Sequence, residues 1–439
     1  MKTTTIFRLF LRYVSLNILG QMAYSCYTLA DTFFVSASLG ADGLTALNLA
    51  FPIFCLINGA GLMLGIGGGT RYSILKSRQE HRQANIVFVN AVYLAVIIAA
   101  LFMVAGMWFS GPLVKWLGAD DTVFSMTNTY LRVMLLFAPA FLANNLLQCF
   151  VRNDGNPALS MAAMISGSLA NVILDYVFIF PLDMGIFGAI LATGLAPVIS
   201  LAVLSPYFIC RKNKFHFVKT APYWMRLREI VSCGMPPFLT EATSGIVMFL
   251  FNFIILRLAG NTGVAAFGVI TVISLVVVAI YTGLSQGIQP IISQRYGARE
   301  KADVQAIFKY ALITMLLLSG VIYSIIYLGA SPLAYIFNNG KNELLQTFAV
   351  SGLKLYFIAG PFIGLNIVLS TYFISTERPL PAQIISLSRG FLVLVPMAFL
   401  LSKIWKMTGV WCTFPATECI VALIGTMLYL KIPYKDKGK

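Results

Sequence analysis

Long apolar stretches recur along the whole chain, and short polar turns separate them. A helix of about 20 such residues crosses a hydrocarbon core about 30 Å thick. Twelve stretches are long enough, at about 13–36, 46–74, 84–109, 123–150, 158–180, 186–210, 230–258, 264–293, 304–328, 344–374, 381–401 and 408–430. The pattern predicts an all-α polytopic membrane protein with twelve transmembrane helices.

A basic connection, RKNKFHFVKTAPYWMRLRE, divides these spans into two equal groups. It forms a cytoplasmic linker over 211–229, between an N-terminal lobe over 1–210 and a C-terminal lobe over 230–439. The lobes look like copies, because glycine and proline landmarks match at an offset of 220 or 222 residues. The matched positions are Gly40 with Gly260, Gly43 with Gly263, Pro139 with Pro361, and Pro157 with Pro379. Six spans return the chain to its starting side, so we expect two parallel, pseudo-symmetric six-helix bundles around a central cleft.

Composition and charge support a membrane location. The 439 residues are 59% hydrophobic and 11% charged, which excludes an ordinary soluble domain. The net charge is +15, but 24 of the 31 Lys and Arg residues lie on alternate connections and 7 on the opposite side. The positive-inside rule then places both termini in the cytoplasm. We therefore expect a multi-pass protein of the cell (inner) membrane, in contact with lipids and without a nucleic-acid partner.

Two acidic residues stand out in the first half. Asp175 lies in an apolar span, one helical turn after Asn171, and Asp31 ends the first span. A lipid-embedded aspartate costs about 2.5–3.5 kcal/mol on insertion scales, so it marks a functional site. If both carboxyl groups face one pocket, they share a proton or a cation, and Asn171 and the Thr193 hydroxyl add oxygen ligands suited to sodium. The alternative is a set of hydrogen bonds between helices, each worth about 0.6 kcal/mol.

The second half carries its own intramembrane polar residues. Glu241 and Glu418 are embedded acids, and Phe251 stands where the repeat would place a counterpart of Asp31. A carboxylate facing the cleft would attract a cationic substrate, with Gln286 and Gln289 adding hydrogen bonds. The glutamines could instead satisfy the backbone near a proline. The two lobes are therefore expected to differ in chemistry.

Several stretches together resemble the multidrug and toxic compound extrusion (MATE) family, in its bacterial MepA/DinF-like branch. They are LADTFFVSASLGADGLTALNLAFP, RNDGNPALSM, LANVILDYVFIF, GIFGAILAT, GVAAFGVI and SQGIQPIISQRYGA. The resemblance implies twelve helices in two bundles, and export of cationic or amphiphilic compounds in exchange for protons or sodium ions. It also implies that Asp31, Asn171, Asp175 and Thr193 form the cation and proton site, with Gln148 and Tyr27 as polar neighbours. Relatives often carry a proline in the first helix, where this chain has Leu16.

The sequence thus predicts a secondary active antiporter working by alternating access, expected as a monomer, with H⁺ or Na⁺ as coupling ion and no cofactor. The closest alternative is a flippase for a lipid-linked or polysaccharide precursor, which would need a basic cavity. An ion channel would conduct without exchange. An intramembrane enzyme such as a prenyl transferase would need clustered acids, and no catalytic or metal-ligating set is evident. His81 and His216 lack metal-ligand spacing, and the glycine-rich GIGGGT at 65–70 is assigned to helix packing.

Overall fold

Helices make up the regular structure of the computed structural model, which describes residues 2–338 and 342–432. In the first half they are α1 Lys2–Ser77, α2 His81–Trp108, α3 Ser110–Trp116, α4 Asp121–Leu136, α5 Ala138–Asn153, α6 Pro157–Ile179 and α7 Gly185–Ile209. In the second half they are α8 Trp224–Gly297, α9 Lys301–Ile336, α10 Glu343–Tyr356, the 3₁₀ turn η1 Phe357–Ala359, α11 Gly360–Ser375, α12 Pro379–Leu387, the π-helical η2 Ser388–Leu392 and α13 Leu394–Lys431. The described ranges contain no strand.

Three of the long helical stretches reverse direction inside the molecule. Gly40, Gly260 and Lys406 have positive φ angles of 62°, 60° and 50° within α1, α8 and α13. Within the described residues, eight stretches are long and apolar enough to cross a membrane, and the bent pair α4–α5 makes a ninth. Because each reversal separates two spans, the nine stretches give the twelve predicted helices.

The repeat inferred from glycine and proline landmarks is confirmed by the backbone. Gly40 and Gly260 adopt almost the same conformation, with φ/ψ of 62°/−146° and 60°/−157°. Only a residue without a side chain adopts this geometry freely. The matched prolines also start matched helices, since Pro157 and Pro379 are the first residues of α6 and α12. Each lobe thus turns at equivalent positions.

The spans differ from the expected limits in two places. The first span begins earlier than expected, because α1 starts at Lys2 and, among its residues, Gly40 alone has non-helical φ/ψ. Its first half is therefore one unbroken helix through Leu16. The fourth expected span is broken at Phe137, where α4 and α5 meet at 47°.

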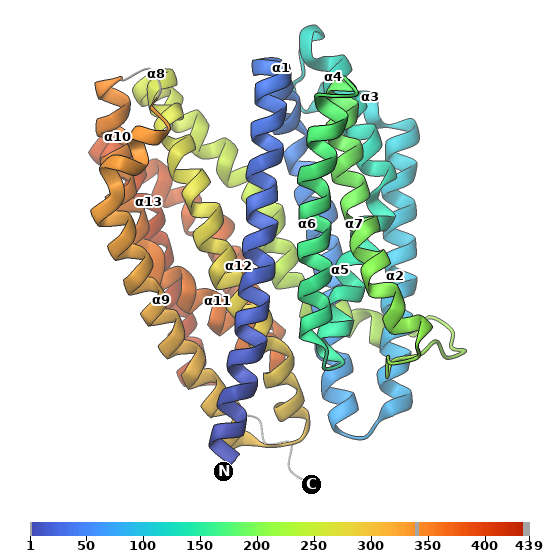
Figure 1. Ribbon diagram of the computed structural model, residues 1–439. Helices are drawn as coiled ribbons and strands as arrows, with labels where there is room; N and C mark the ends of the chain where they lie inside the picture. Colours follow the sequence, from blue (N-terminus) through green and yellow to red (C-terminus); the bar gives the residue numbers. More distant parts are fainter. Residues whose placement is uncertain (1, 339–341, 433–439) are drawn as a thin grey trace.

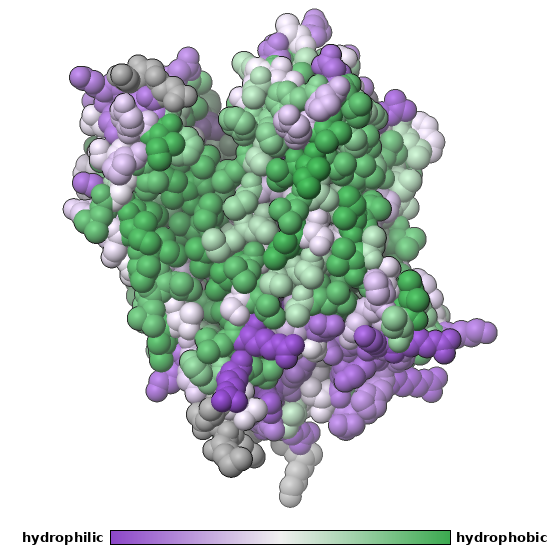
Figure 2. Space-filling model, viewed as in Figure 1, coloured by the Kyte–Doolittle hydropathy of each residue, from purple (hydrophilic) through white to green (hydrophobic). Residues whose placement is uncertain are grey.

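Two separate hydrophobic cores hold the two lobes. One contains side chains from the second half of the chain, and the other contains side chains from residues 35–230. The exceptions are at the two ends of α1, where Phe10, Tyr13 and Val14 near its start and Ile74 near its end belong to the core of the second lobe. The lobes spread apart at the end that carries α4 and α10, and a notch separates them there (Figures 1 and 2).

Glycines close the opposite end of the molecule. A Cβ on Gly234 of α8 would lie 1.9 Å from the carbonyl oxygen of Met63 of α1. A Cβ on Gly287 would lie 2.7 Å from the Cα of Val14. Gly67 belongs to the first crossing as well, since a Cβ on it would lie 2.9 Å from the backbone nitrogen of Gly234. The two crossings are therefore related by the repeat, because residues 14 and 234 match, as do 67 and 287, at the offset of 220. Small residues let the two backbones touch, which is how membrane helices pack most closely.

Charged side chains cover the same closed end, which is strongly hydrophilic (Figure 2). Arg71 of the first lobe pairs with Glu229, at 2.9 Å from Nη2 to Oε2, and with Glu377. Arg78 pairs with the same Glu377 at 3.1 Å. Both glutamates belong to the second half of the chain, so these ion pairs join the lobes.

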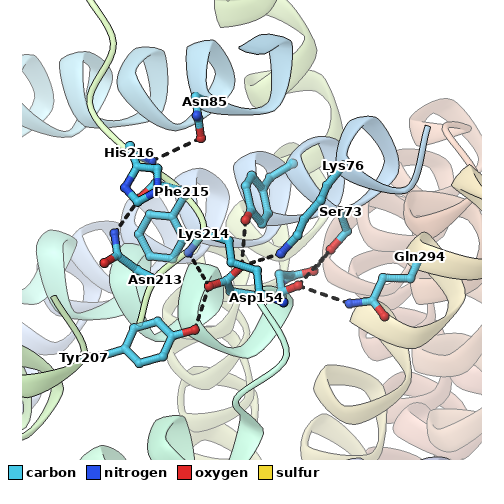
Figure 3. Close-up of polar contacts among 12 residues, drawn as sticks. Ser73, Lys76, Asn85, Asp154, Tyr207, Asn213, Lys214, Phe215, His216 and Gln294 are labelled. Carbon is cyan, nitrogen blue, oxygen red and sulfur yellow. Dashed lines mark hydrogen bonds and ion pairs between the residues drawn. The ribbon is translucent and has the colours of Figure 1, made fainter. Parts of the chain in front are cut away.

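The connection after α7 is held against the first lobe by Asp154 (Figure 3). Its carboxylate accepts hydrogen bonds from the hydroxyls of Tyr72 at 2.7 Å and Tyr207 at 2.6 Å, and from the backbone N–H of Lys214 at 2.9 Å. It also pairs with the Lys76 ammonium at 2.5 Å. A buried carboxylate with these partners fixes the start of the connection to three helices at once.

Candidate functional site

Asp31 and Asp175 come together inside the first lobe. Asp31 is on the first half of α1 and Asp175 on α6, and their side chains lie within hydrogen-bonding reach of each other. The two residues are 7% and 0% exposed. Oδ1 of each finds no partner among the described residues. Two carboxylates in contact, away from water, cannot both stay charged without a counter-ion, so the pair must share a proton or a cation.

Asn171 and Thr193 extend this pair. In the orientation of its amide that satisfies both neighbours, Asn171 donates to Oδ2 of Asp175 at 3.0 Å and accepts from the backbone N–H of Thr193 at 3.3 Å. The Thr193 hydroxyl donates to the carbonyl of Ala189 at 3.1 Å. Carboxylate, amide and hydroxyl oxygens around one point suit a hard cation as well as a proton.

Two tyrosines border the acidic pair. Tyr27, a predicted neighbour, lies near both carboxyl groups and packs its ring edge-on against Tyr24 at 5.0 Å. Tyr130 of α4 is also buried and close to Asp31, Asp175 and Thr193. Sequence reasoning missed Tyr130, because a tyrosine in an apolar span carries no signal that separates it from a packing residue.

Gln148 hydrogen-bonds other residues than the two carboxyl groups. Its Nε2 donates to Oδ1 of Asn144 at 2.8 Å and to Oγ of Ser200 at 3.0 Å. The side chain lines a cavity of about 110 Å³ that also reaches Tyr27. Gln148 is therefore a residue of the cleft wall and not a direct partner of the acidic pair.

A central cleft lies between the lobes and consists of two adjoining cavities. The second has a volume of about 190 Å³ and opens among residues of the second lobe. The two cavities share the wall residues Leu62, Arg152, Glu241, Thr282 and Gln286. Residues from both halves of the chain thus line the two cavities, which adjoin at these shared residues.

The two embedded glutamates of the second half have different surroundings. Glu241 lines both cavities, and its Oε2 accepts a hydrogen bond from Asn58 at 3.2 Å. Glu418 is 1% exposed, pairs with Arg389 at 2.8 Å and accepts from Asn366 at 2.6 Å. It lines neither cavity, so the expectation of a second cleft acid is not met in this conformation. A charge neutralised inside one lobe holds helices together and is not free for a ligand.

Gln286 and Gln289 are at the floor of the cleft, where the lobes meet. Gln286 accepts from Arg152 at 2.7 Å. Gln289 donates to Thr70 at 2.8 Å and accepts from Asn153 at 3.1 Å, so it joins the second lobe to the first. Both also line the second cavity.

Arg152 is where the sequence interpretation was wrong. It is one of the 24 Lys and Arg residues that the sequence assigns to the alternate, cytoplasmic connections, but α5 continues through Asn153 and buries Arg152 to 1% exposure. The polar run RNDGNP indicated a loop, although its first two residues are helical. The turn begins only at Asp154, the C-cap of α5.

The MatE family model matches residues 17–177 and 236–400, once in each lobe. The chain therefore belongs to the MatE family. It is 24% identical over 430 residues to "Multidrug export protein MepA" of Staphylococcus saprophyticus, covering 97% of this chain and 94% of that protein. It is 23% identical over 425 residues to the protein of that name in Staphylococcus aureus strain NCTC 8325, covering 96% and 93%.

Solved structures share the fold. One is an outward-facing conformation of a multidrug resistance MATE family transporter of the MOP superfamily, with a TM-score of 0.91 and 23% identity over 96% of this chain and 95% of that one. Another is a MOP superfamily transporter from Pyrococcus furiosus, described as having a binding pocket of reverse polarity, with a TM-score of 0.89 and 23% identity over the same shares.

Proposed function

We propose that this protein is a secondary active multidrug exporter, which moves cationic or amphiphilic organic compounds outward in exchange for protons or sodium ions. Its family membership and the name of its relatives, multidrug export protein, support this function. The observation that carries it is the contact between Asp31 and Asp175, because an exchanger needs a group that binds and releases a cation.

The acidic pair would couple the ion to the drug in one cycle. In the conformation open away from the cytoplasm, an external proton or sodium ion binds at Asp31 and Asp175, with Asn171 and Thr193 as further ligands. Its binding weakens the hold on the drug and favours the return of the lobes to the inward-facing state. One charge crossing 100 mV is worth about 2.3 kcal/mol. Exchange of one proton for one monocationic drug moves no net charge, so the pH difference alone would drive it.

The same proposal includes the surroundings of the protein. It works as a monomer in the cell (inner) membrane, with both termini in the cytoplasm. The basic, closed end of the molecule then faces the cytoplasm, where lysine and arginine gather by the positive-inside rule.

A flippase for lipid-linked precursors is not favoured. Such a protein needs a strongly positive cleft to hold phosphate, whereas this cleft contains Glu241 as well as Arg152. The other embedded arginine, Arg389, is paired with Glu418.

Drug uptake into everted membrane vesicles tests the proposal. Asp31→Asn and Asp175→Asn should each abolish ion-driven uptake, because an amide neither releases a proton nor neutralises sodium. Asp183→Asn is the matched control, since Asp183 is an exposed aspartate whose positive φ of 47° asparagine tolerates. Runs with and without sodium, at two pH values, identify the ion.

Full ion-driven uptake in both Asp31→Asn and Asp175→Asn, with the protein present at normal levels, contradicts the assignment of the coupling site. Loss of uptake in Asp183→Asn as well would mean that any change of charge disables the protein.

A further inference from the structure

The connection between α7 and α8 is basic and carries no acid. Residues 211–223 include Arg211, Lys212, Lys214 and Lys219, and no Asp or Glu. All four of these residues are exposed, and none of them forms an ion pair within the described residues. Their positive charges therefore face outward without a counter-charge from the protein.

This connection runs along the side of α2. The backbone N–H of His216 donates to Oδ1 of Asn85 at 3.1 Å (Figure 3), and the Tyr93 hydroxyl donates to the carbonyl of Thr220 at 3.0 Å. Eight residues of helix between Asn85 and Tyr93 correspond to a rise of about 12 Å. The connection thus climbs along α2, and Figure 1 shows it projecting sideways past α2, above the turn that joins α1 and α2.

The upper part of the connection lies close to the lipid-facing part of α2. The N–H of Tyr223 donates to Oδ1 of Asn90 at 2.8 Å. Val96 and Ile97, which begin the exposed apolar face of α2, are 61% and 55% exposed and lie about one turn beyond Tyr93. Because α2 is apolar enough to cross a membrane, this level is the boundary between headgroups and hydrocarbon. The polar side chains of α2 supply partners to a backbone that is partly removed from water there.

Aromatic side chains on the same segment point away from the protein. Phe217, Tyr223 and Trp224 are 73%, 51% and 77% exposed. Phe215, by contrast, is buried against Phe88 at 4.7 Å between ring centroids, so it fixes the segment to the first lobe. Aromatic rings gather at membrane interfaces, and long basic side chains next to them reach toward the headgroups. Exposed rings and unpaired basic groups together are typical of a segment in the headgroup layer.

We propose that residues 211–224 form a binding segment for anionic phospholipids. Arg211, Lys212 and Lys219 bind the negatively charged headgroups, and Phe217 and Trp224 lie among the first acyl carbons. A zwitterionic lipid has no net charge to offer these residues, so the segment selects anionic over zwitterionic lipids. Each Lys or Arg near an anionic surface contributes up to about five-fold in binding. This inference goes beyond the proposed export function, because it involves neither the cleft nor the acidic pair.

Quenching of Trp224 by brominated lipids tests the proposal. The purified full-length protein is placed in nanodiscs of four parts phosphatidylcholine to one part phosphatidylglycerol. Bromine is carried on the acyl chains of either lipid, at the same mole fraction, and quenches a tryptophan that the chains touch. The signal of the other four tryptophans is measured in Trp224→Phe and subtracted. We expect phosphatidylglycerol to occupy the site beside Trp224 with a binding constant about 5- to 100-fold that of phosphatidylcholine.

Removing the basic groups should remove the preference. In the triple variant Arg211→Gln, Lys212→Gln, Lys219→Gln, the ratio of the two binding constants should fall below about two-fold. Quenching by phosphatidylcholine should persist, since the aromatic side chains remain. Added salt should lower the ratio in the unmodified protein, because it screens exposed charges. This salt series decides the question even if the triple variant is not obtained as a folded protein.

A second triple variant controls for net charge. Arg8→Gln, Arg12→Gln, Lys309→Gln removes the same three charges from other exposed positions of α1 and α9. It should leave the ratio of the two binding constants unchanged within about two-fold. An equal loss of preference in both triple variants would assign the effect to the overall charge of the protein and overturn the proposal.

Three other outcomes also overturn it. Equal quenching by the two brominated lipids means that the segment does not select headgroup charge. Quenching of Trp224 by neither lipid means that the segment stands in water. Loss of the preference on adding inorganic phosphate, but not chloride at the same ionic strength, would assign the basic residues to a soluble anion. None of these measurements needs a drug or an ion gradient, so they are independent of any result on coupled transport.

Discussion

Gly234→Ala should push the lobes apart at their closed end. The added Cβ would lie 1.9 Å from the carbonyl oxygen and 2.6 Å from the carbonyl carbon of Met63. Both are backbone atoms of α1, so no side-chain rotation relieves the overlap. Ordinary contact begins at 3.4 Å, and 3.4 minus 1.9 gives a displacement of 1.5 Å between α8 and α1.

The energy of this displacement sets the size of the effect. Inserting a methyl group into a well-packed interface costs about 1–3 kcal/mol. The cost applies to the conformation in which the closed end is formed, so the equilibrium shifts toward the opposite conformation. Since 1.4 kcal/mol corresponds to ten-fold, the population ratio changes by about 5- to 150-fold.

Spin labels at the open end report the shift. Trp116→Cys and Leu344→Cys place labels on α3 and α10, at positions that are 81% and 52% exposed, in a background without the seven native cysteines. Gly234→Ala should move the distance distribution between the labels toward shorter values. Gly268→Ala, on the same α8, is the control because a Cβ there meets nothing within 4 Å.

A distance distribution in Gly234→Ala that matches the one in Gly268→Ala would refute the reasoning. In that case the close contact of α1 and α8 does not limit which conformation is populated.

Three other substitutions follow from the charged contacts. Glu377→Gln removes the acid that holds two arginines of the first lobe, and the same label pair should again move to shorter distances. Added salt screens these ion pairs in the unmodified protein, so the difference in distance between the two proteins should shrink as salt is added. Asp154→Asn leaves the Lys76 ammonium without its counter-charge and should destabilise the first lobe by about 3 kcal/mol, seen as a lower melting temperature in detergent, whereas an unchanged melting temperature contradicts this. The Thr122 hydroxyl holds the pKa of Asp120 below its ordinary value, so the cap of α4 is intact at neutral pH and is lost only as the pH falls through that lowered pKa. At pH 7, hydrogen exchange at the start of α4 should therefore be faster in Asp120→Ala than in the unmodified protein, where the cap is intact.

The membrane spans were predictable because their signal is local. Each span is an apolar stretch of the required length, and several of the positions where the chain turns carry glycines and prolines that recur at an offset of 220 or 222. Gly40 and Gly260 show this most clearly, since both adopt the left-handed conformation that favours glycine.

The side-chain partners were predicted less well. Asp31 and Asp175 could be paired because an acid in lipid needs a partner and few others exist in that half. Glu418 gave the same signal but pairs with Arg389, and nothing in the sequence separates an acid held inside a lobe from one facing a cleft. The position of Arg152 was mispredicted because the end of α5 depends on the packing of this helix against both lobes. The polar residues around Arg152 are, by themselves, typical of a turn.

The two lobes meet like a dimer of identical subunits, and this has a consequence for how the protein could specialise. Ser77 and Gly297 are equivalent positions, and a Cβ on Gly297 would lie 2.9 Å from the Cβ of Ser77, so each faces its own counterpart across the pseudo-axis. In a true homodimer both positions would carry one residue type. Joining the halves in one chain lets each side diverge alone. The first lobe could therefore acquire Asp31 while its counterpart Phe251 stayed an apolar side chain stacked on Phe267.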